Sequence, residues 1–364
     1  MKPACRVLSI DGGGIKGIIP CIILKEIEEK TGRKISKLFN LIAGTSTGGI
    51  IALGLTKKDR SGMVNTYSAN DLLDLYVKNG KDIFPEREKD LVSRLGSMFE
   101  KTRDVTARNY DSAGIERLML EKFGEARLTD ALIDTLITTY DINSGRPYYF
   151  SSRIARLKLN EGNKEENILM RDVARSTSAA PTFFAPNIVN DSNSKMAFVD
   201  GGVFANNPSV LAYSEAKEIW KHDTKTDSAY SKGVDAIVTA DDKDLPFFML
   251  SLGCGSSKSS VSYTNAEEWR TLNWIQPLLT DIFMRSSEES VRYTMQYLLP
   301  PFVNGNLRYE RLSPEIDRSV SQMDNVSDAN IEALQEVATS YVKTPEVRLK
   351  IDNVCKILTD GWKQ

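Results

Sequence analysis

A serine flanked by small residues stands where an apolar run gives way to a helical one. Residues 44–48, GTSTG, have the G-x-S-x-G spacing, with Gly44 and Gly48 on either side of Ser46. A sharp turn from strand to helix strains the backbone at the serine and leaves no room for flanking side chains. Such a turn projects the hydroxyl above the edge of a sheet, so the pattern predicts that Ser46 is a nucleophile. An ordinary Gly/Ser-rich turn is the alternative interpretation.

A serine nucleophile needs a base, and histidine is the usual one. The chain has a single histidine, His222, which lies in the polar stretch WKHDTKTD, where a solvated surface side chain is expected. A Ser-His-Asp triad is therefore not predicted, and a carboxylate or a lysine must activate Ser46.

The best placed carboxylate is Asp200. It follows an apolar run and precedes Gly201 and Gly202, which indicates a tight turn at the carboxyl end of a strand, where the sites of open α/β sheets gather. Asp-Gly also forms ordinary turns, and Asp11 at the end of the first apolar run is a competitor. Burial beside Ser46 would raise the pKa of a carboxyl from its usual value of about 3.9 and make it a stronger base.

Three glycines, Gly12, Gly13 and Gly14, follow the first apolar run. Their amides can stabilise the oxyanion that forms when a nucleophile attacks an ester, and loss of one such donor typically costs about 10²–10³ in rate. Glycine allows the backbone to approach closely because it has no Cβ. Lys16 either adds positive potential to this loop or is a solvated helix residue.

The same loop has a second interpretation. Residues 12–17 match G-x-G-x-x-G after a strand, which indicates an NAD(P)-binding oxidoreductase of the Rossmann type. That fingerprint expects an acid about 20 residues further on, at the end of the second strand, to bind ribose. Here the second strand ends in residues 43–46, Ala-Gly-Thr-Ser, with no acid. The hydrolase interpretation is therefore favoured, and the oxidoreductase stays as the alternative.

The elements that carry these residues follow from periodicity. Strands are predicted within residues 6–10, 38–44, 131–142, 146–152, 196–203 and 246–256, and the first two helices within 15–32 and 47–58. This order predicts an α/β fold with an open, mostly parallel sheet flanked by helices. Gly32 is expected to cap the first helix. From about residue 267 the pattern is largely helical, with Ser327 as an N-cap.

Composition excludes several classes of protein. The 364 residues carry 47 Lys and Arg against 49 Asp and Glu, so the formal charge of −2 favours neither a nucleic acid polymer as partner nor electrostatic docking on anionic lipid. Four scattered cysteines, Cys5, Cys21, Cys254 and Cys355, have no metal-ligand spacing, so reduced, buried thiols and no metal are expected. Without a secretory signal or a membrane-spanning run, a cytoplasmic protein is expected.

Several spaced blocks resemble one family. DGGGIKG, GTSTGG and DGG, in this order, resemble the three signature blocks of the patatin-like phospholipases, and three further blocks within residues 174–186, 203–212 and 250–255 look like family blocks. The resemblance covers residues 7–255. It implies a patatin-like, three-layer α/β/α fold and a Ser-Asp dyad that hydrolyses phospholipids or other lipid esters without a cofactor.

The resemblance also implies a role for each residue. Ser46 would be the nucleophile and Asp200 the base, the amides of residues 12–14 would form the oxyanion hole, and Asp11 would order that loop. We expect an acyl hydrolase domain over residues 1–310, with an insertion or lid at about 59–112, and a helical C-terminal extension over 311–364 that packs on it.

The size of the chain and its C-terminal tail resemble those of a narrower group, the bacterial patatin-like effectors of anti-phage systems. A cyclic dinucleotide activates these effectors. This resemblance implies an allosteric pocket, formed with the helical C-terminal region. The lipid substrate implies peripheral association with a membrane, for which the candidate contacts are Ile83-Phe84, Met98-Phe99 and the helical run 269–284. Core packing is the alternative for that run, and a homo-oligomer is one option for the assembly.

Overall fold

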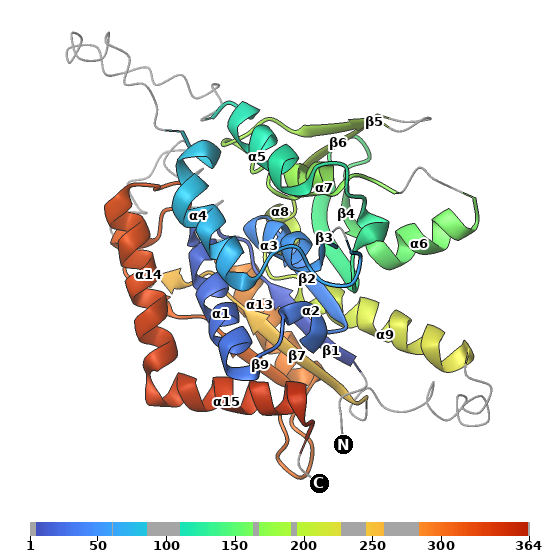
Figure 1. The fold of residues 1–364 in the computed structure, drawn as a ribbon, viewed down its shortest axis with the longest axis vertical. Coiled ribbons are helices and arrows are strands. Elements are labelled where there is room, and N and C mark those ends of the chain that lie inside the picture. The colour runs from blue at the N-terminus through green and yellow to red at the C-terminus, as the bar shows by residue number, and fades with distance from the viewer. Residues whose placement is uncertain are drawn as a thin grey trace, which may run out of the picture.

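The computed structural model describes residues 5–59, 61–85, 110–162, 167–190, 195–226, 245–257 and 284–362. Its centre is an eight-stranded sheet in the order β5-β6-β3-β2-β1-β7-β9, with β4 paired to β3 (Figure 1). Five neighbouring strands are parallel: β3 (Asp134–Asp141), β2 (Leu41–Thr45), β1 (Cys5–Ile10), β7 (Phe247–Leu252) and β9 (Tyr309–Leu312). The carboxyl ends of these strands therefore meet at one edge of the sheet.

The remaining strands make the sheet mixed. β4 (Arg146–Ser151) and β6 (Lys195–Asp200) are antiparallel to β3, and β5 (Asn187–Asn190) is antiparallel to β6. A separate two-stranded sheet joins β8 (Ser256–Ser257) to β10 (Glu315–Ile316). The predicted α/β fold with an open, mostly parallel sheet is confirmed.

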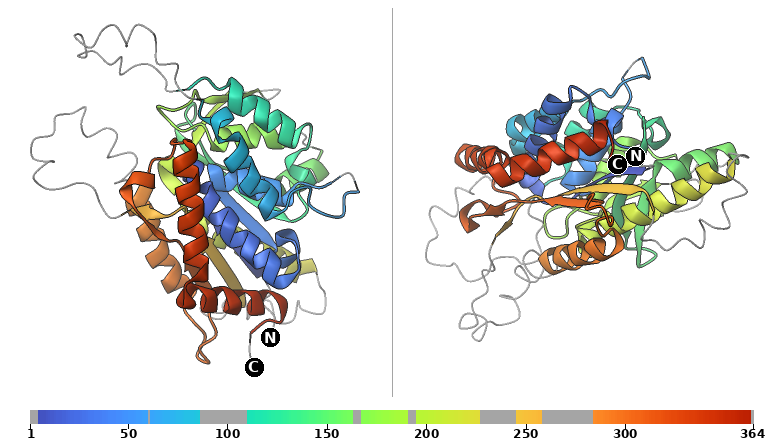
Figure 2. Two further views of the ribbon diagram at one scale, coloured as in Figure 1. Left: turned by 60° about the vertical axis from the view of Figure 1, so that its left-hand side comes forward. Right: turned by 90° about the horizontal axis from the view of Figure 1, so that it is seen from below.

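Helices cover both faces of the sheet, as the edge-on view in Figure 2 shows. The α-helices are α1 (Ile18–Thr31), α2 (Ile35–Leu38), α3 (Thr47–Thr56), α4 (Ala69–Ile83), α5 (Ala113–Phe123), α6 (Ser152–Asn160), α7 (Met170–Thr177), α8 (Gly202–Ala205), α9 (Ser209–Thr226), α13 (Met284–Leu298), α14 (Asp328–Lys343) and α15 (Pro345–Thr359). Short 3₁₀ helices are η1 (Gly14–Gly17), η2 (Leu128–Asp130) and η5 (Arg318–Val320). α1, α3 and α14 pack on one face, and α9 and α13 pack on the other.

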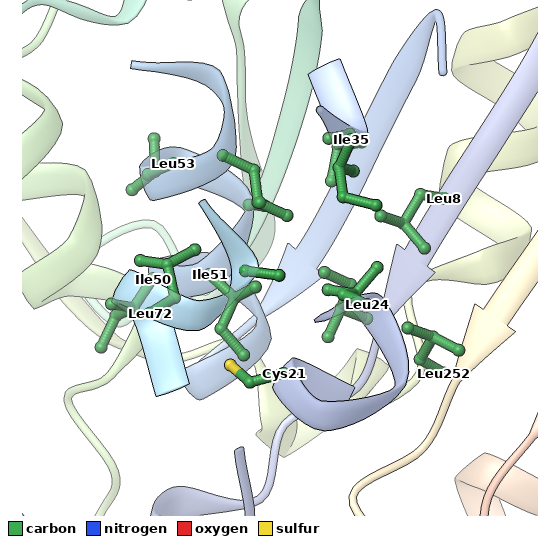
Figure 3. Packing of buried hydrophobic residues seen from close by; sticks show 14 of the residues in the cluster. Leu8, Cys21, Leu24, Ile35, Ile50, Ile51, Leu53, Leu72 and Leu252 are labelled. Atoms are coloured by element: carbon green, nitrogen blue, oxygen red, sulfur yellow. The ribbon is translucent and has the colours of Figure 1, made fainter. Parts of the chain in front are cut away.

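The larger core lies between the sheet and the first of these helix layers. Figure 3 shows Leu8, Leu24 and Ile51 among its side chains. All ten residues of α3 are buried, which explains why its sequence is apolar all round. Burial of one Leu or Ile side chain contributes about 1.5–3 kcal/mol, so this layer holds α3 and the turn before it firmly on the sheet.

Two predicted helix ends are confirmed. Gly32 follows α1 with φ 63°, in the left-handed region that favours glycine, and its amide donates to Glu28. The side chain of Ser327 accepts a hydrogen bond from the amide of Asn330 at the start of α14. The four cysteines are buried thiols, as expected.

The C-terminal region departs from the helical expectation, because β9 joins the main sheet beside β7. This strand has only four residues, and its centre is Glu310-Arg311, so it lacks the apolar run that marks a buried strand. Its charges find partners only in the folded chain: Lys350 lies near Glu310, and Asp11 contacts Arg311.

The expected membrane contact at Ile83-Phe84 is wrong. These side chains are 4% and 8% exposed, and the ring of Phe84 packs against those of Tyr110 and Phe184. The other two candidate contacts, Met98-Phe99 and the run 269–284, lie outside the described residues apart from the start of α13, as does the side chain of His222. Among the described helices, none is long and apolar enough to cross a membrane.

Candidate active site

Ser46 occupies the turn between β2 and α3 with φ 54° and ψ −121°, a conformation that favours glycine. The flanking glycines are needed for steric reasons. A Cβ on Gly44 would lie 2.2 Å from the carbonyl oxygen of Gly48, and a Cβ on Gly48 would lie 2.2 Å from that of Ile10. Backbone atoms cannot move aside, so the geometry is that of a strained nucleophile elbow.

A threonine that the sequence analysis did not single out fixes this turn. The amide of Ser46 donates to Oγ1 of Thr177 at 2.8 Å, and that hydroxyl donates to the carbonyl oxygen of Thr138 at 2.7 Å. Thr177 ends α7 and belongs to the block within residues 174–186 that resembles the family. Its position in that block was the only feature of the sequence that pointed to Thr177. The contact ties the elbow to β3 and α7.

Asp200 ends β6, and its carboxylate lies beside the hydroxyl of Ser46, close enough for that hydroxyl to lower the pKa of the carboxyl. The amide of Gly202 donates a hydrogen bond to Oδ1 of Asp200 at 2.7 Å. A Cβ on Gly201 would lie 2.2 Å from Oγ1 of Thr138, so the turn needs glycine to bring β6 against β3. The structure thus brings together the predicted nucleophile and the predicted base, which are far apart in the sequence.

Burial raises the pKa of Asp200 to about 6, although the hydroxyl of Ser46 and the amide of Gly202 act in the opposite direction. Among the described residues, no cation lies close enough to pair with this carboxylate. A buried carboxylate without a cationic partner is a stronger base than one in water.

The glycine loop lies beside Ser46, since a Cβ on Gly12 would be 3.2 Å from the Cβ of Ser46. The amide of Gly12, however, donates to the carbonyl oxygen of Asn206 at 3.1 Å, so it is engaged within the protein. Within the described part of the chain, the amides of Gly13 and Gly14 have no acceptor. Of the three amides expected in the oxyanion hole, only those of Gly13 and Gly14 therefore remain available to a substrate.

The loop is tightly enclosed. A Cβ on Gly13 would lie 2.4 Å from the Cβ of Cys254, and a Cβ on Gly14 would lie 2.2 Å from the carbonyl oxygen of Met323. Gly14 also has φ 61°, which favours glycine. Lys16, in the following η1 turn, is partly exposed, and its positive charge acts to lower the pKa of the Cys254 thiol.

Asp11, the competing carboxylate, is engaged elsewhere. Its oxygens lie 3.4 Å and 2.6 Å from the two terminal nitrogens of Arg311, and Glu288 contacts the same guanidinium. Burial raises the pKa of Asp11 to about 7, and Glu288 adds to the shift, whereas Arg311 opposes it. Arg311 and Glu288 come from β9 and α13, where the sequence offered no motif that pointed to them.

Comparison with known proteins identifies the family of this chain. The family model described as Patatin-like phospholipase matches residues 8–213. Patatin-like protein 1 of Arabidopsis thaliana is 28% identical over 374 residues, which cover 96% of this chain and 85% of that protein. Patatin-04/09 of Solanum tuberosum is 30% identical over 367 residues, which cover 95% and 85%.

A third relative, from Solanum tuberosum, is named Probable inactive patatin-3-Kuras 1; it is 30% identical over 386 residues, which cover 98% of this chain and 93% of that protein. Among solved structures, VipD from Legionella pneumophila aligns with a TM-score of 0.34 and 11% identity over 93% of this chain and 67% of that one, and we draw no conclusion from it.

A mixed, mostly parallel sheet between helix layers, with a serine elbow and a buried aspartate beside it, defines a serine hydrolase of the patatin type. The chain belongs to the patatin-like phospholipase family, a family of serine hydrolases that act on lipid acyl esters. This assignment favours the hydrolase over the NAD(P)-dependent oxidoreductase.

Proposed function

We propose that Ser46 and Asp200 form the catalytic dyad of a lipid acyl hydrolase. The proximity of the two side chains, inside a buried site at a strained elbow, carries this proposal. One of the relatives bears the name Probable inactive patatin-3-Kuras 1, so overall similarity does not decide whether this chain turns over substrate. The proposal therefore depends on the contact between the two residues.

In the proposed reaction, Oγ of Ser46 attacks the ester carbonyl while Asp200 accepts the hydroxyl proton. The alcohol leaves with that proton, and an acyl-enzyme remains. Asp200 then removes a proton from water, which attacks the acyl group and releases the fatty acid. The amides of Gly13 and Gly14 are the proposed donors to the oxyanion in both steps.

The pH dependence of hydrolysis tests the base. Asp200 must be ionised to accept a proton, so we expect kcat/KM to fall about tenfold per pH unit below the pKa of about 6. A carboxylate at its ordinary pKa of about 3.9 would place the fall about two units lower. Initial rates with a soluble short-chain ester, measured from about pH 4 to about pH 8, decide between these outcomes.

Activation by a cyclic dinucleotide, as in the bacterial anti-phage effectors, stays a proposal. What supports it is a hollow of about 580 Å³ between the end of α1 and α15, lined in part by Lys30, Arg33 and Lys356. Cationic side chains suit the phosphates of a dinucleotide. Lys30 already pairs with Asp352 at 2.8 Å, so a phosphate would have to compete with that carboxylate.

The assay for the proposed function is release of fatty acid from phospholipid vesicles, with and without a panel of cyclic dinucleotides. We expect hydrolysis by the wild-type chain. If a nucleotide stimulates it, Arg33→Glu should abolish the stimulation and keep the basal rate. Equal rates with and without every nucleotide would leave the hydrolase in place and remove the switch.

A further inference from the structure

A buried charge cluster lies next to the proposed dyad and takes no part in the reaction as written above. Its members are Asp11, Arg311 and Glu288, whose side chains are 1%, 8% and 16% exposed. They come from the end of β1, from β9 and from α13. Asp11 directly precedes the glycine loop, so whatever fixes Asp11 also fixes the start of that loop.

Arg311 reaches a second part of the site through hydroxyl groups. Its Nη1 donates to Oγ of Ser251 at 2.7 Å, and Ser251 lies 3.2 Å from Oγ of Ser209. Ser209 in turn donates to Oδ1 of Asn207 at 2.6 Å. Asn207 belongs to the turn that follows α8, a few residues after Asp200.

The two parts meet at the loop itself. The carbonyl oxygen of Asn206, next to Asn207, accepts the amide of Gly12, and Nδ2 of Asn206 donates to the carbonyl oxygen of Gly12 at 3.4 Å. One guanidinium therefore supports the glycine loop from the Asp11 side and from the Asn206-Asn207 side.

We infer that Arg311 is a positioning residue for the oxyanion hole: it holds Asp11 and the Ser251–Ser209–Asn207 chain so that the amides of Gly13 and Gly14 face the carbonyl oxygen of the ester that Ser46 attacks. This inference rests on the proposed hydrolase function. Donors to an oxyanion act only when they are already in place, and a displacement of about 1 Å can cost about 10²-fold in rate.

The chemistry of this position requires arginine. Its planar fork meets the two oxygens of Asp11 with Nη1 and Nη2, and Nη1 also donates to Ser251, whereas a lysine ammonium offers a point charge with no fixed plane. The charge matters as well, because an unpaired carboxylate at Asp11 would repel the oxyanion that forms beside the loop. Arg311→Lys keeps the charge and removes the fork.

The test uses the full chain with a soluble short-chain ester and an alkyl trifluoromethyl ketone. Oγ of Ser46 adds to the ketone carbon, the carbonyl oxygen becomes an oxyanion, and Asp200 takes the proton, so affinity for the ketone reports on the oxyanion hole. For Arg311→Lys we expect kcat to fall about 10- to 100-fold, KM to stay within about twofold, and ketone affinity to fall in parallel with kcat.

Arg153→Lys is the matched control. Arg153 binds Glu215 through Nε and Nη2 at 2.8 Å and 3.0 Å, and it follows β4 near the amino end of β3, away from Ser46. The control should keep kcat and ketone affinity. If Arg311→Lys does not fold, Ser251→Ala is tested instead, because it removes one contact of the guanidinium. For Ser251→Ala we expect kcat to fall about 3- to 10-fold.

The inference is overturned if kcat is unchanged in Arg311→Lys or, where that variant does not fold, in Ser251→Ala. It is also overturned if Arg153→Lys shows an equal fall in kcat, or if kcat falls in the Arg311 variant while its affinity for the ketone is unchanged. These outcomes differ from failure of the hydrolase itself. In that case the wild-type chain and Ser46→Ala would hydrolyse the ester equally slowly, and no arginine variant would change the rate.

Discussion

We expect the Ser46→Ala variant to lose ester hydrolysis by a factor of about 10⁴ or more while it keeps its fold. The substitution removes the oxygen that attacks the substrate and leaves the amides of the glycine loop in place. Alanine retains a Cβ, so the strained backbone at φ 54° is neither relieved nor made worse. The measurement is kcat with a soluble ester, accompanied by thermal melting.

Ser46→Gly separates chemistry from strain. It is equally inactive, but glycine adopts this conformation without cost, so we expect its free energy of unfolding to rise by about 1 kcal/mol or more relative to Ser46→Ala. Ser36→Ala is the matched control, because Ser36 is also buried and donates to Asn65 at 2.8 Å, before the amino end of β2. Normal turnover by Ser46→Ala would refute the nucleophile.

The second large effect concerns Asp200→Asn. An amide of the same shape cannot accept the proton of Ser46, so we expect kcat to fall by about 10⁴-fold. The fold should become more stable, because burial raises the pKa of Asp200 from 3.8 to about 6. Ionising this carboxyl in the folded chain therefore costs about 3 kcal/mol.

The sign of this effect depends on pH. A raised pKa in the folded state means that the protonated carboxyl stabilises the fold below about pH 4 and that this stability is lost as pH rises through about 6. Asp200→Asn should therefore exceed the wild type in free energy of unfolding at about pH 8 and match it below about pH 4. Denaturant unfolding at both pH values measures the difference.

Asp134→Asn is the control for the dyad. Asp134 is also a largely buried carboxyl with a raised pKa, but it pairs with Arg156 at the amino end of β3. Its substitution should leave kcat and the acid side of the pH profile unchanged. An active Asp200→Asn, or an equal loss in Asp134→Asn, would contradict the assignment of the base.

Much of the fold was predictable because its signals are local. Short apolar runs bounded by glycine predicted β1, β2 and β7, and helical spacing predicted α1 and α3. β9 escaped because a four-residue strand with two charges at its centre has no local signature. It forms only because β7 offers a parallel edge and because partners from elsewhere neutralise its charges.

The candidate site divides in the same way. The sequence by itself determined the elbow at Ser46, because G-x-S-x-G between a strand and a helix is a local steric requirement. It also narrowed the base to a carboxylate or a lysine, because the chain has one histidine. Only the tertiary structure decided which carboxylate meets Ser46. It places Asp200 beside Ser46 and pairs Asp11 with Arg311, which lies 300 residues further along the chain.

Tertiary structure also decided which amides stay free, since the carbonyl of Asn206 takes the amide of Gly12 and leaves those of Gly13 and Gly14. The reason is physical. A motif determines the backbone geometry of its own few residues, whereas the partner of a buried charge or amide depends on which distant segments the packed core brings to the same edge of the sheet.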